Sequence, residues 1–324
     1  MFQTAVKKIS RMLVRKSVFF LPEERQIAIE RRHRGREQLG KLKKADCAIV
    51  SHGKSGRTWL RVMLSRIYQQ RHGLPEGSLL SFDDFNRKNA AVPKIFFTHD
   101  NYLRNYTCSD SAVADYGGRR VLMLVRHPAD VTVSQYFQWK HRMRVDKKGL
   151  LGYPDHGEDI ELFDFMMRPE WGVARVIEFM NFWARDFERL DPFTMTRYED
   201  LRRDPENELA RVMAFIGTPA TAEEIREAVE YGSVENMRQR EQQSGASIGG
   251  GRLRPRDVNN PDSYKVRRAK VGGYRDYFDD EQVRQIDELV DATLAPVFGY
   301  HSEARRETTQ NGPAEGPAAA VGSE

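Results

Sequence analysis

The stretch from residue 47 to residue 67 constrains the fold more than any other part of the chain. It starts with a short apolar run at residues 47–50, turns through a glycine-containing loop at residues 53–58, and then becomes amphipathic. Apolar side chains recur in its last part at helical spacing, at Leu60, Met63, Leu64 and Ile67. A short buried run followed at once by a loop and an amphipathic segment is typical of a strand–loop–helix unit in an α/β protein.

The loop of this unit has the composition of an anion-binding site. Gly53 and Gly56 allow a sharp turn, so that loop N–H groups can converge at the positive end of the helix dipole, where phosphate binds. Lys54 adds a full positive charge. The complete nucleoside-triphosphate loop, G-x-x-x-x-G-K-[ST], requires a glycine where this chain has Ala48, so the Walker motif is incomplete. Similar loops also occur in α/β domains that bind no anion, and that alternative stays open here.

Two further apolar runs indicate the rest of a parallel sheet. Residues 121–125 are apolar without interruption, as in strands that are buried on both faces. Arg126 follows this strand directly, and its guanidinium offers a fork of donors to phosphate oxygens. Residues 94–98 form a third run that ends at His99. Catalytic side chains often stand at such strand ends, although a lone histidine there is also compatible with a structural role.

These segments, taken in order, resemble the motifs of sulfotransferases that use 3′-phosphoadenosine 5′-phosphosulfate (PAPS). The loop reads GKSGRTWL where that family usually has PKSGTTWL, and the strand before His99 ends in FTH instead of KTH. Residues 126–136 match R-N-P-x-D-x-x-x-S-x-Y, and residues 198–201 match Y-E-D-L. Residues 233–238 are similar to S-F-E-x-M-K, and residues 267–278 to R-K-G-x-x-G-D-W-K-x-x-F.

The resemblance implies an α/β fold with a P-loop-like phosphate site and in-line transfer of a sulfuryl group from PAPS. The acceptor is then a hydroxyl or amine of a small molecule, lipid or glycan, with His99 as general base and Lys54 and Ser134 in the catalytic set. Trp59 would stack on adenine, and Arg126, Ser134 and Arg267 would hold the 3′-phosphate. The residues implied to bind the co-substrate are Lys54, Ser55, Gly56, Arg57, Thr58, Trp59, Arg126, Ser134, Tyr198, Ser233, Val234, Arg267, Arg268 and Ala269.

Several positions depart from the family pattern and leave two other functions open. Phe97 replaces the usual lysine, Ala269 replaces a usual glycine, and Val234 replaces a usual phenylalanine. A non-catalytic nucleotide-binding module is one alternative. A P-loop kinase is the other, and it would need Mg²⁺ and an acidic residue at a strand end. We expect no metal, because fixed cations and backbone dipoles can neutralise a phosphosulfate.

Charge and composition divide the chain into three predicted parts. Residues 1–44 form a basic arm with 13 Lys and Arg against four Glu, whereas the rest of the chain has a net charge of −4. Residues 45–300 are expected to form one sulfotransferase domain, and residues 301–324, rich in Gly, Pro and Ala, a disordered tail. Two cysteines without a C-x-x-C pair fit a reducing compartment.

The basic arm bears on the location and the partners of the protein. It has no apolar run near the length of a membrane span, so a cytoplasmic protein is expected. Its amphipathic pattern suits either packing on the domain or peripheral contact with an anionic inner membrane surface. Aromatic residues do not interleave with the arginines at 31–36, so nucleic acid is not an expected partner.

Three other segments carry expectations about organisation. Residues 140–160 read as an excursion over the site that helps to recognise the acceptor, rather than as a core element. Residues 162–190 read as an amphipathic helical stretch with an aromatic core face, and residues 280–298 as a last helix. Residues 244–251, rich in glycine and serine, read as a gate over the cofactor or as a mobile surface loop.

Overall fold

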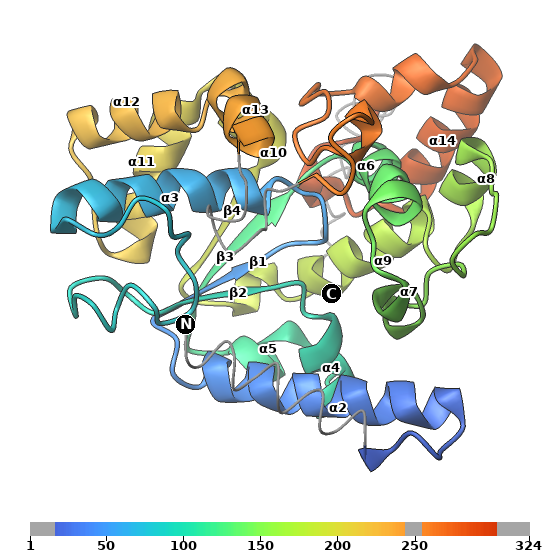
Figure 1. The fold of residues 1–324 in the computed structure, drawn as a ribbon, viewed down its shortest axis with the longest axis horizontal. Coiled ribbons are helices and arrows are strands. Elements are labelled where there is room, and N and C mark those ends of the chain that lie inside the picture. Colours follow the sequence, from blue (N-terminus) through green and yellow to red (C-terminus); the bar gives the residue numbers. More distant parts are fainter. Residues whose placement is uncertain (1–16, 244–254, 303–324) are drawn as a thin grey trace, which may run out of the picture.

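Parallel strands form the centre of the computed structural model, which describes residues 17–243 and 255–302. Within these residues one sheet has the strand order β2-β1-β3-β4. Its strands are β1 (Cys47–Val50), β2 (Ile95–Thr98), β3 (Arg120–Val125) and β4 (Phe193–Arg197). Helices flank the sheet (Figure 1), which confirms the predicted α/β domain with a central parallel sheet.

The register of the strands brings their carboxyl ends to one edge of the sheet. In β1, Val50 lies opposite Thr98 of β2 and Met123 of β3. Because all the strands run in the same direction, the residues that follow them meet beyond this edge. Ligands bind at this place in open α/β sheets.

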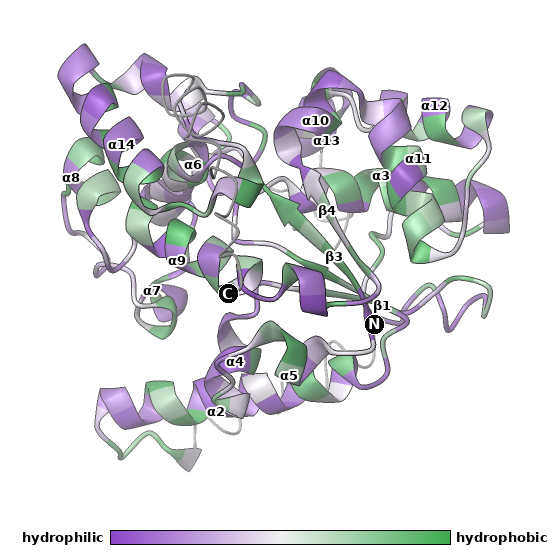
Figure 2. Ribbon diagram, turned by 180° about the vertical axis from the view of Figure 1, so that it is seen from behind, coloured by the Kyte–Doolittle hydropathy of each residue, from purple (hydrophilic) through white to green (hydrophobic). Residues whose placement is uncertain are grey.

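Alternation along β3 divides the interior into two cores. Val121, Met123 and Val125 face one core, and Leu122 and Leu124 face the other, because successive side chains of a strand point to opposite faces. The strands at the centre are accordingly drawn in the hydrophobic colour in Figure 2. On the face of Leu122 lie α3 (Arg57–His72), α11 (Pro205–Ile216) and α12 (Ala222–Tyr231). The other face is covered by α4 (Asn101–Thr107), α5 (Ala112–Tyr116), α6 (Pro128–His141), α9 (Val173–Ala184) and α14 (Asp280–Thr293).

The predicted helix after the anion-binding loop is α3, which runs from Arg57 to His72. It begins after Gly56, whose φ of 93° is in the left-handed region, and it ends at Gly73 with φ of 60°. Glycine adopts both conformations without a steric penalty. The helix after β3 likewise begins at Pro128, where a missing N–H costs nothing.

Helix α2 (Glu23–Leu42) occupies much of the predicted basic arm. It packs along α4 and against β2, and the Arg31 side chain donates a hydrogen bond of 2.9 Å to the Leu150 carbonyl. The division of the chain at residue 45 stays a prediction. Residues 1–16, with the amphipathic part of the arm, and residues 303–324 of the tail lie outside the described residues.

One expectation about the middle of the chain is wrong, and the helical stretch with an aromatic core face predicted at residues 162–190 is confirmed in three pieces. Residues 140–160 contain a packed helix, α7 (Val145–Leu151), with Met143 and Leu150 buried, so this segment contributes to the core. Residues 162–190 are broken into α8 (Leu162–Met167), α9 and a 3₁₀ turn at Phe187–Arg189. The break falls at Gly172, where a Cβ would lie only 2.2 Å from the Met166 carbonyl oxygen.

The remaining elements close the site from the C-terminal side. They are α10 (Tyr198–Arg203), α13 (Val234–Gln243) and 3₁₀ turns at Pro261–Ser263, Gly273–Tyr277 and Pro296–Phe298. The last predicted helix therefore ends at Thr293, earlier than expected. The predicted gate at residues 244–251 lies outside the described residues. None of the helices in the described ranges combines the length and apolar content that a membrane span requires.

Candidate active site

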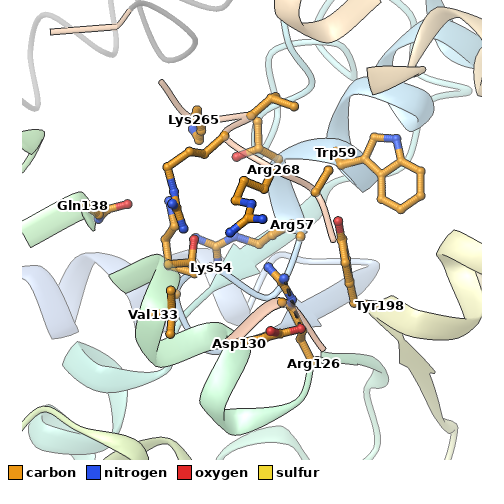
Figure 3. Close-up of a pocket in the computed structure, with 18 of the residues that line it drawn as sticks. Lys54, Arg57, Trp59, Arg126, Asp130, Val133, Gln138, Tyr198, Lys265 and Arg268 are labelled. Atoms are coloured by element: carbon orange, nitrogen blue, oxygen red, sulfur yellow. Dashed lines mark ion pairs between the residues drawn. The ribbon is translucent and has the colours of Figure 1, made fainter. Parts of the chain in front are cut away.

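A pocket of about 580 Å³ lies at the carboxyl edge of the sheet, and most of the predicted site residues line it. Figure 3 shows Lys54, Arg57 and Arg268 near its centre and Trp59 and Tyr198 on one side. The predicted residues that line the pocket are Lys54, Gly56, Arg57, Thr58, Trp59, His99, Arg126, Ser134, Tyr198, Val234, Arg267, Arg268 and Ala269. Ser55 is buried behind the loop, and Ser233 instead accepts a hydrogen bond of 3.2 Å from the Asn236 N–H in the first turn of α13.

The loop that precedes α3 is tightly constrained. Lys54 adopts a φ of 74°, an uncommon conformation for a residue with a side chain. A Cβ at Gly56 would lie 2.6 Å from the Tyr198 ring, so only glycine fits between the loop and α10. Among the described residues no side chain caps the N-terminus of α3, whose first N–H groups are therefore suited to an anion.

Lys54 lies in an environment that opposes its charge. Burial, and next the positive charges of Arg142 and Arg126, together lower the pKa of Lys54 from 10.5 to about 7, against the opposing effect of Glu241. An anion bound beside the amine would reverse this shift, because an opposite charge favours the ammonium form.

His99 is held as a neutral imidazole. Its Nδ1 lies 2.8 Å from the Ser51 carbonyl oxygen, and its Nε2 lies 2.5 Å from Nη2 of Arg57. A carbonyl only accepts and a guanidinium only donates, so Nδ1 carries the proton and Nε2 carries the lone pair. Burial, and next the charge of Arg57, lower the pKa of His99 well below its ordinary value. Nε2 is thus an unprotonated base that faces the pocket.

Arg126 combines several contacts at the opposite end of the pocket. Its Nη2 donates to the Lys270 carbonyl at 3.0 Å and lies 3.3 Å from Asp130, and its guanidinium lies 4.4 Å from the Tyr198 ring centre. Its buried Nε has no hydrogen-bond partner among the described residues. A guanidinium fixed in this way retains donor capacity for an oxyanion.

Asp130, which the sequence marked only as a motif position, connects α6 with the C-terminal segment of the site. Its carboxylate accepts from the N–H groups of Gly272 and Tyr274 at 2.9 and 3.0 Å. These bonds fix the segment that carries Arg268 and Ala269. Ala269 has a φ of 53°, which explains why glycine suits this position.

Trp59 is fixed by a hydrogen bond from Nε1 to the Gly232 carbonyl at 2.8 Å. Its ring makes an edge-to-face contact with Tyr198, with centroids 5.7 Å apart, and Arg202 lies 5.5 Å from its centre. A Cβ at Gly232 would lie 2.8 Å from Cγ of Met63. This corner therefore offers an aromatic surface of fixed orientation.

Sequence reasoning missed several residues at the pocket. Glu241 is fully buried and accepts hydrogen bonds from the N–H groups of Lys265 and Val266, and it pairs with Arg142 at 3.4 Å. No local pattern distinguishes it from the other polar residues of α13. Arg61 follows Arg57 by one helical turn, and that spacing was a signal for it. Glu241 itself lies outside the lining of the pocket. The lining residues that were not predicted include Phe97, Gln138, Lys147, Arg202, Lys265 and Lys270. In the part of the chain that the structure describes, no group of His, Cys, Asp or Glu could hold a metal ion.

Comparison with known proteins identifies the class to which this fold and this site belong. A model of the sulfotransferase domain matches residues 117–298, more than half of the chain. The chain belongs to the sulfotransferase family, which confirms the predicted enzyme class and sets the kinase alternative aside.

Relatives of established activity align well beyond that segment. Flavonol 3-sulfotransferase of Flaveria bidentis is 25% identical over 283 residues, which cover 80% of this chain and 84% of that protein. Sulfotransferase 2A1 of Mus musculus is 22% identical over 267 residues, covering 78% of this chain and 86% of that protein.

Solved structures support the fold. A crystal structure of mouse sulfotransferase SULT7A1 complexed with PAP has a TM-score of 0.52 and 17% identity, and covers 85% of this chain and 93% of that chain. A structure of retinol dehydratase in a complex with retinol and PAP has a TM-score of 0.51 and 17% identity, covering 77% and 81%. At this identity the likeness shows the fold alone.

Proposed function

We propose that this sulfotransferase takes its sulfuryl group from PAPS and transfers it to a hydroxyl of a small-molecule acceptor, with His99 as general base. The observation that carries the proposal is the unprotonated Nε2 of His99, which opens into the same pocket as the Lys54 loop. This arrangement also speaks against a non-catalytic binding module, which would need no base beside its phosphate loop.

The donor set of the pocket suits the two anionic ends of PAPS. The N-terminus of α3 and Lys54 face the position for the phosphosulfate. Arg126 and Ser134 face the position for the 3′-phosphate. Arg267 and Arg268 border the same end, where Arg268 is paired with Asp276 at 2.7 Å. The fixed Trp59 ring supplies the surface for adenine. Two structural neighbours were solved with PAP, which agrees with this assignment.

The chemistry then needs one proton transfer and one displacement. The acceptor oxygen forms a bond to sulfur while the bond between sulfur and the 5′-phosphate oxygen breaks, and the hydroxyl proton passes to Nε2 of His99. Negative charge that develops on the leaving oxygen is stabilised by Lys54, the loop N–H groups and the Thr58 hydroxyl. Arg57 must yield its position at Nε2 when the hydroxyl binds, because both cannot occupy the same lone pair.

The names of relatives support an acceptor class and a location. The name of flavonol 3-sulfotransferase gives a flavonol, a small molecule, as its acceptor. The name of cytosolic sulfotransferase 15 of Arabidopsis thaliana gives the cytosol as its compartment. We assign this chain a small-molecule hydroxyl acceptor and a cytoplasmic location on that basis. An amine, lipid or glycan acceptor is the less favoured reading.

The donor site is tested by calorimetric titration with adenosine 3′,5′-bisphosphate, ADP and ATP in the absence of Mg²⁺. We expect the bisphosphate to bind tightest, and Arg126→Ala to weaken it by at least about 10-fold, because a charge-assisted bond to phosphate is lost. Arg284→Ala, an exposed arginine on α14 outside the pocket, serves as the matched control. Preference for ATP, or an Arg126 variant that binds like the wild type, would contradict the assignment.

Peripheral membrane contact is a separate proposal, supported by the N-terminal sequence. Residues 1–16 are basic, and the adjoining Phe19 and Phe20 are 76% and 70% exposed. Basic charge next to exposed aromatic rings suits an anionic lipid surface. We expect the protein to sediment with phosphatidylserine vesicles and several-fold less after Phe19→Ser and Phe20→Ser. A wild-type protein that stays in the supernatant would dismiss the contact.

A further inference from the structure

The topology of the sheet separates two halves of the pocket. Tyr198 follows β4 and contacts Trp59, whereas Phe97 belongs to β2 and His99 directly follows it, at the opposite edge of the sheet. Figure 3 shows Trp59 and Tyr198 together on one side of the pocket. The half at β2 is therefore where an acceptor must lie to reach Nε2 of His99.

The half of the pocket that would hold PAPS has a set of cations of its own. PAPS carries about four negative charges, two on the 3′-phosphate and two on the phosphosulfate. The cations at this half, on the loop, beside Tyr198 and on the C-terminal segment, are Lys54, Arg126, Arg202, Arg267, Arg268 and Lys270. The carboxylates that pair with cations of this half are Asp130, which lines the pocket and contacts Arg126, and Asp262 and Asp276, which lie outside the lining and contact Arg267, Arg268 and Lys270.

The half at β2 holds further positive charge, separate from the cations at the donor half. Arg57 contacts His99, Arg61 lies over the Phe97 ring with its guanidinium carbon 4.0 Å from the centroid, and Lys147 also lines the pocket. Among the described residues no carboxylate pairs with Arg61, and its buried Nε has no hydrogen-bond partner. A buried donor without a partner is costly, and an oxyanion would satisfy it.

The positions of these residues set a distance. Residues 57 and 61 share one face of α3, with Cβ atoms about 6 Å apart, and residues 97 and 99 are about 7 Å apart along β2. The two pairs face each other, Arg57 on His99 and Arg61 on Phe97. This spacing of about 7 Å sets the scale of the separation between a hydroxyl at Nε2 of His99 and an oxyanion at Arg61.

We propose that the acceptor is an anion, a hydroxy compound with a carboxylate or similar oxyanion about 7 Å from the reacting oxygen, and that Arg61 determines this specificity by binding the oxyanion. The proposal rests on the sulfotransferase function proposed above. The planar fork of a guanidinium matches a carboxylate, and the Phe97 ring beneath it restricts the orientation of that fork.

The test compares acceptors that differ only in charge. Initial rates are measured with labelled PAPS for a panel of hydroxy acids and their methyl esters, with 4-hydroxyphenylacetate as the leading pair because its phenolic oxygen and carboxylate have the required separation. We expect the acid to exceed its ester in kcat/KM by at least about 10-fold in the wild type, since a charge-assisted pair is worth this much. Arg61→Gln should bring the ratio near one, mainly through KM of the acid, and Arg61→Lys should restore part of it.

Two controls separate the possible failures. Arg284→Gln removes an exposed arginine outside the pocket and should keep the wild-type ratio, and thermal melting of each variant verifies folding. Binding of adenosine 3′,5′-bisphosphate is measured on the same preparations. If the bisphosphate does not bind, the proposed function fails. If it binds but esters react as well as acids, no pair is sulfated, or Arg61→Gln leaves the ratio unchanged, the anionic acceptor is ruled out while the donor site stands.

Discussion

His99→Ala should reduce the rate of sulfuryl transfer by about 10²- to 10⁴-fold, the range typical for loss of a general base. The affinity for adenosine 3′,5′-bisphosphate should stay close to that of the wild type, because His99 contacts Ser51 and Arg57 rather than the residues around Arg126. Single-turnover rates with labelled PAPS and calorimetry on the same variant measure the two effects. Equal losses in both measurements would indicate a structural role for His99.

A matched variant and a pH profile sharpen this test. His156→Ala removes an exposed histidine that does not line the pocket, and it should leave both quantities unchanged. Because the pKa of His99 lies well below its usual value, the base is unprotonated at neutral pH. In the wild type kcat/KM should therefore not decline as the pH falls from 8 to about 6.5, the ordinary pKa of histidine. A decline with a midpoint near that value would show that His99 titrates like an exposed imidazole.

Most of the fold could be predicted because its main elements are encoded locally. β1 and β3 are buried on both faces, so they appear in the sequence as continuous apolar runs. The order of the motifs along the chain then predicted that the loop and Arg126 lie at the same edge of the sheet. The prediction for residues 140–160 was wrong because charged residues of this segment are buried, although charged residues usually lie at the surface. Lys148 is almost fully buried, with its ammonium 4.8 Å from the Trp139 ring centre.

The parts of the site that escaped prediction depend on residues distant in sequence. Arg61 looks like one more solvated arginine on a helix, and only the packing of α3 on β2 brings it over Phe97. Glu241 accepts hydrogen bonds from the backbone N–H groups of Lys265 and Val266. Because every residue except proline has a backbone N–H, the sequence does not indicate which ones Glu241 binds. Asp130 was recognised as part of a motif, but its task of holding Gly272 and Tyr274 became evident from the geometry alone.

Lys54 should make the affinity for adenosine 3′,5′-bisphosphate fall as the pH rises from 7 to 9. Its pKa is about 7 in the free protein, and a bound polyanion favours the ammonium, so the pKa must be higher in the complex. Binding above pH 7 therefore takes up a proton, and the dissociation constant rises by up to about tenfold per pH unit. Below pH 7 the amine is already charged, so this dependence disappears. Calorimetry in two buffers of different ionisation enthalpy measures both the affinity and the proton uptake.

Variants at the same position isolate this effect from other titrations. The 3′- and 5′-phosphates of the ligand both have a second pKa near 6 and are already dianions over most of the measured range, so their titration adds little. Lys54→Arg keeps a charge that does not titrate and should remove the pH dependence. Lys54→Met should bind weakly at every pH and lower kcat by about 10²- to 10³-fold, because charge on the leaving oxygen loses a stabilising donor. A wild-type affinity that is constant between pH 7 and 9 would mean that Lys54 is fully charged before the anion binds, and the loop would then need no proton to accept its ligand.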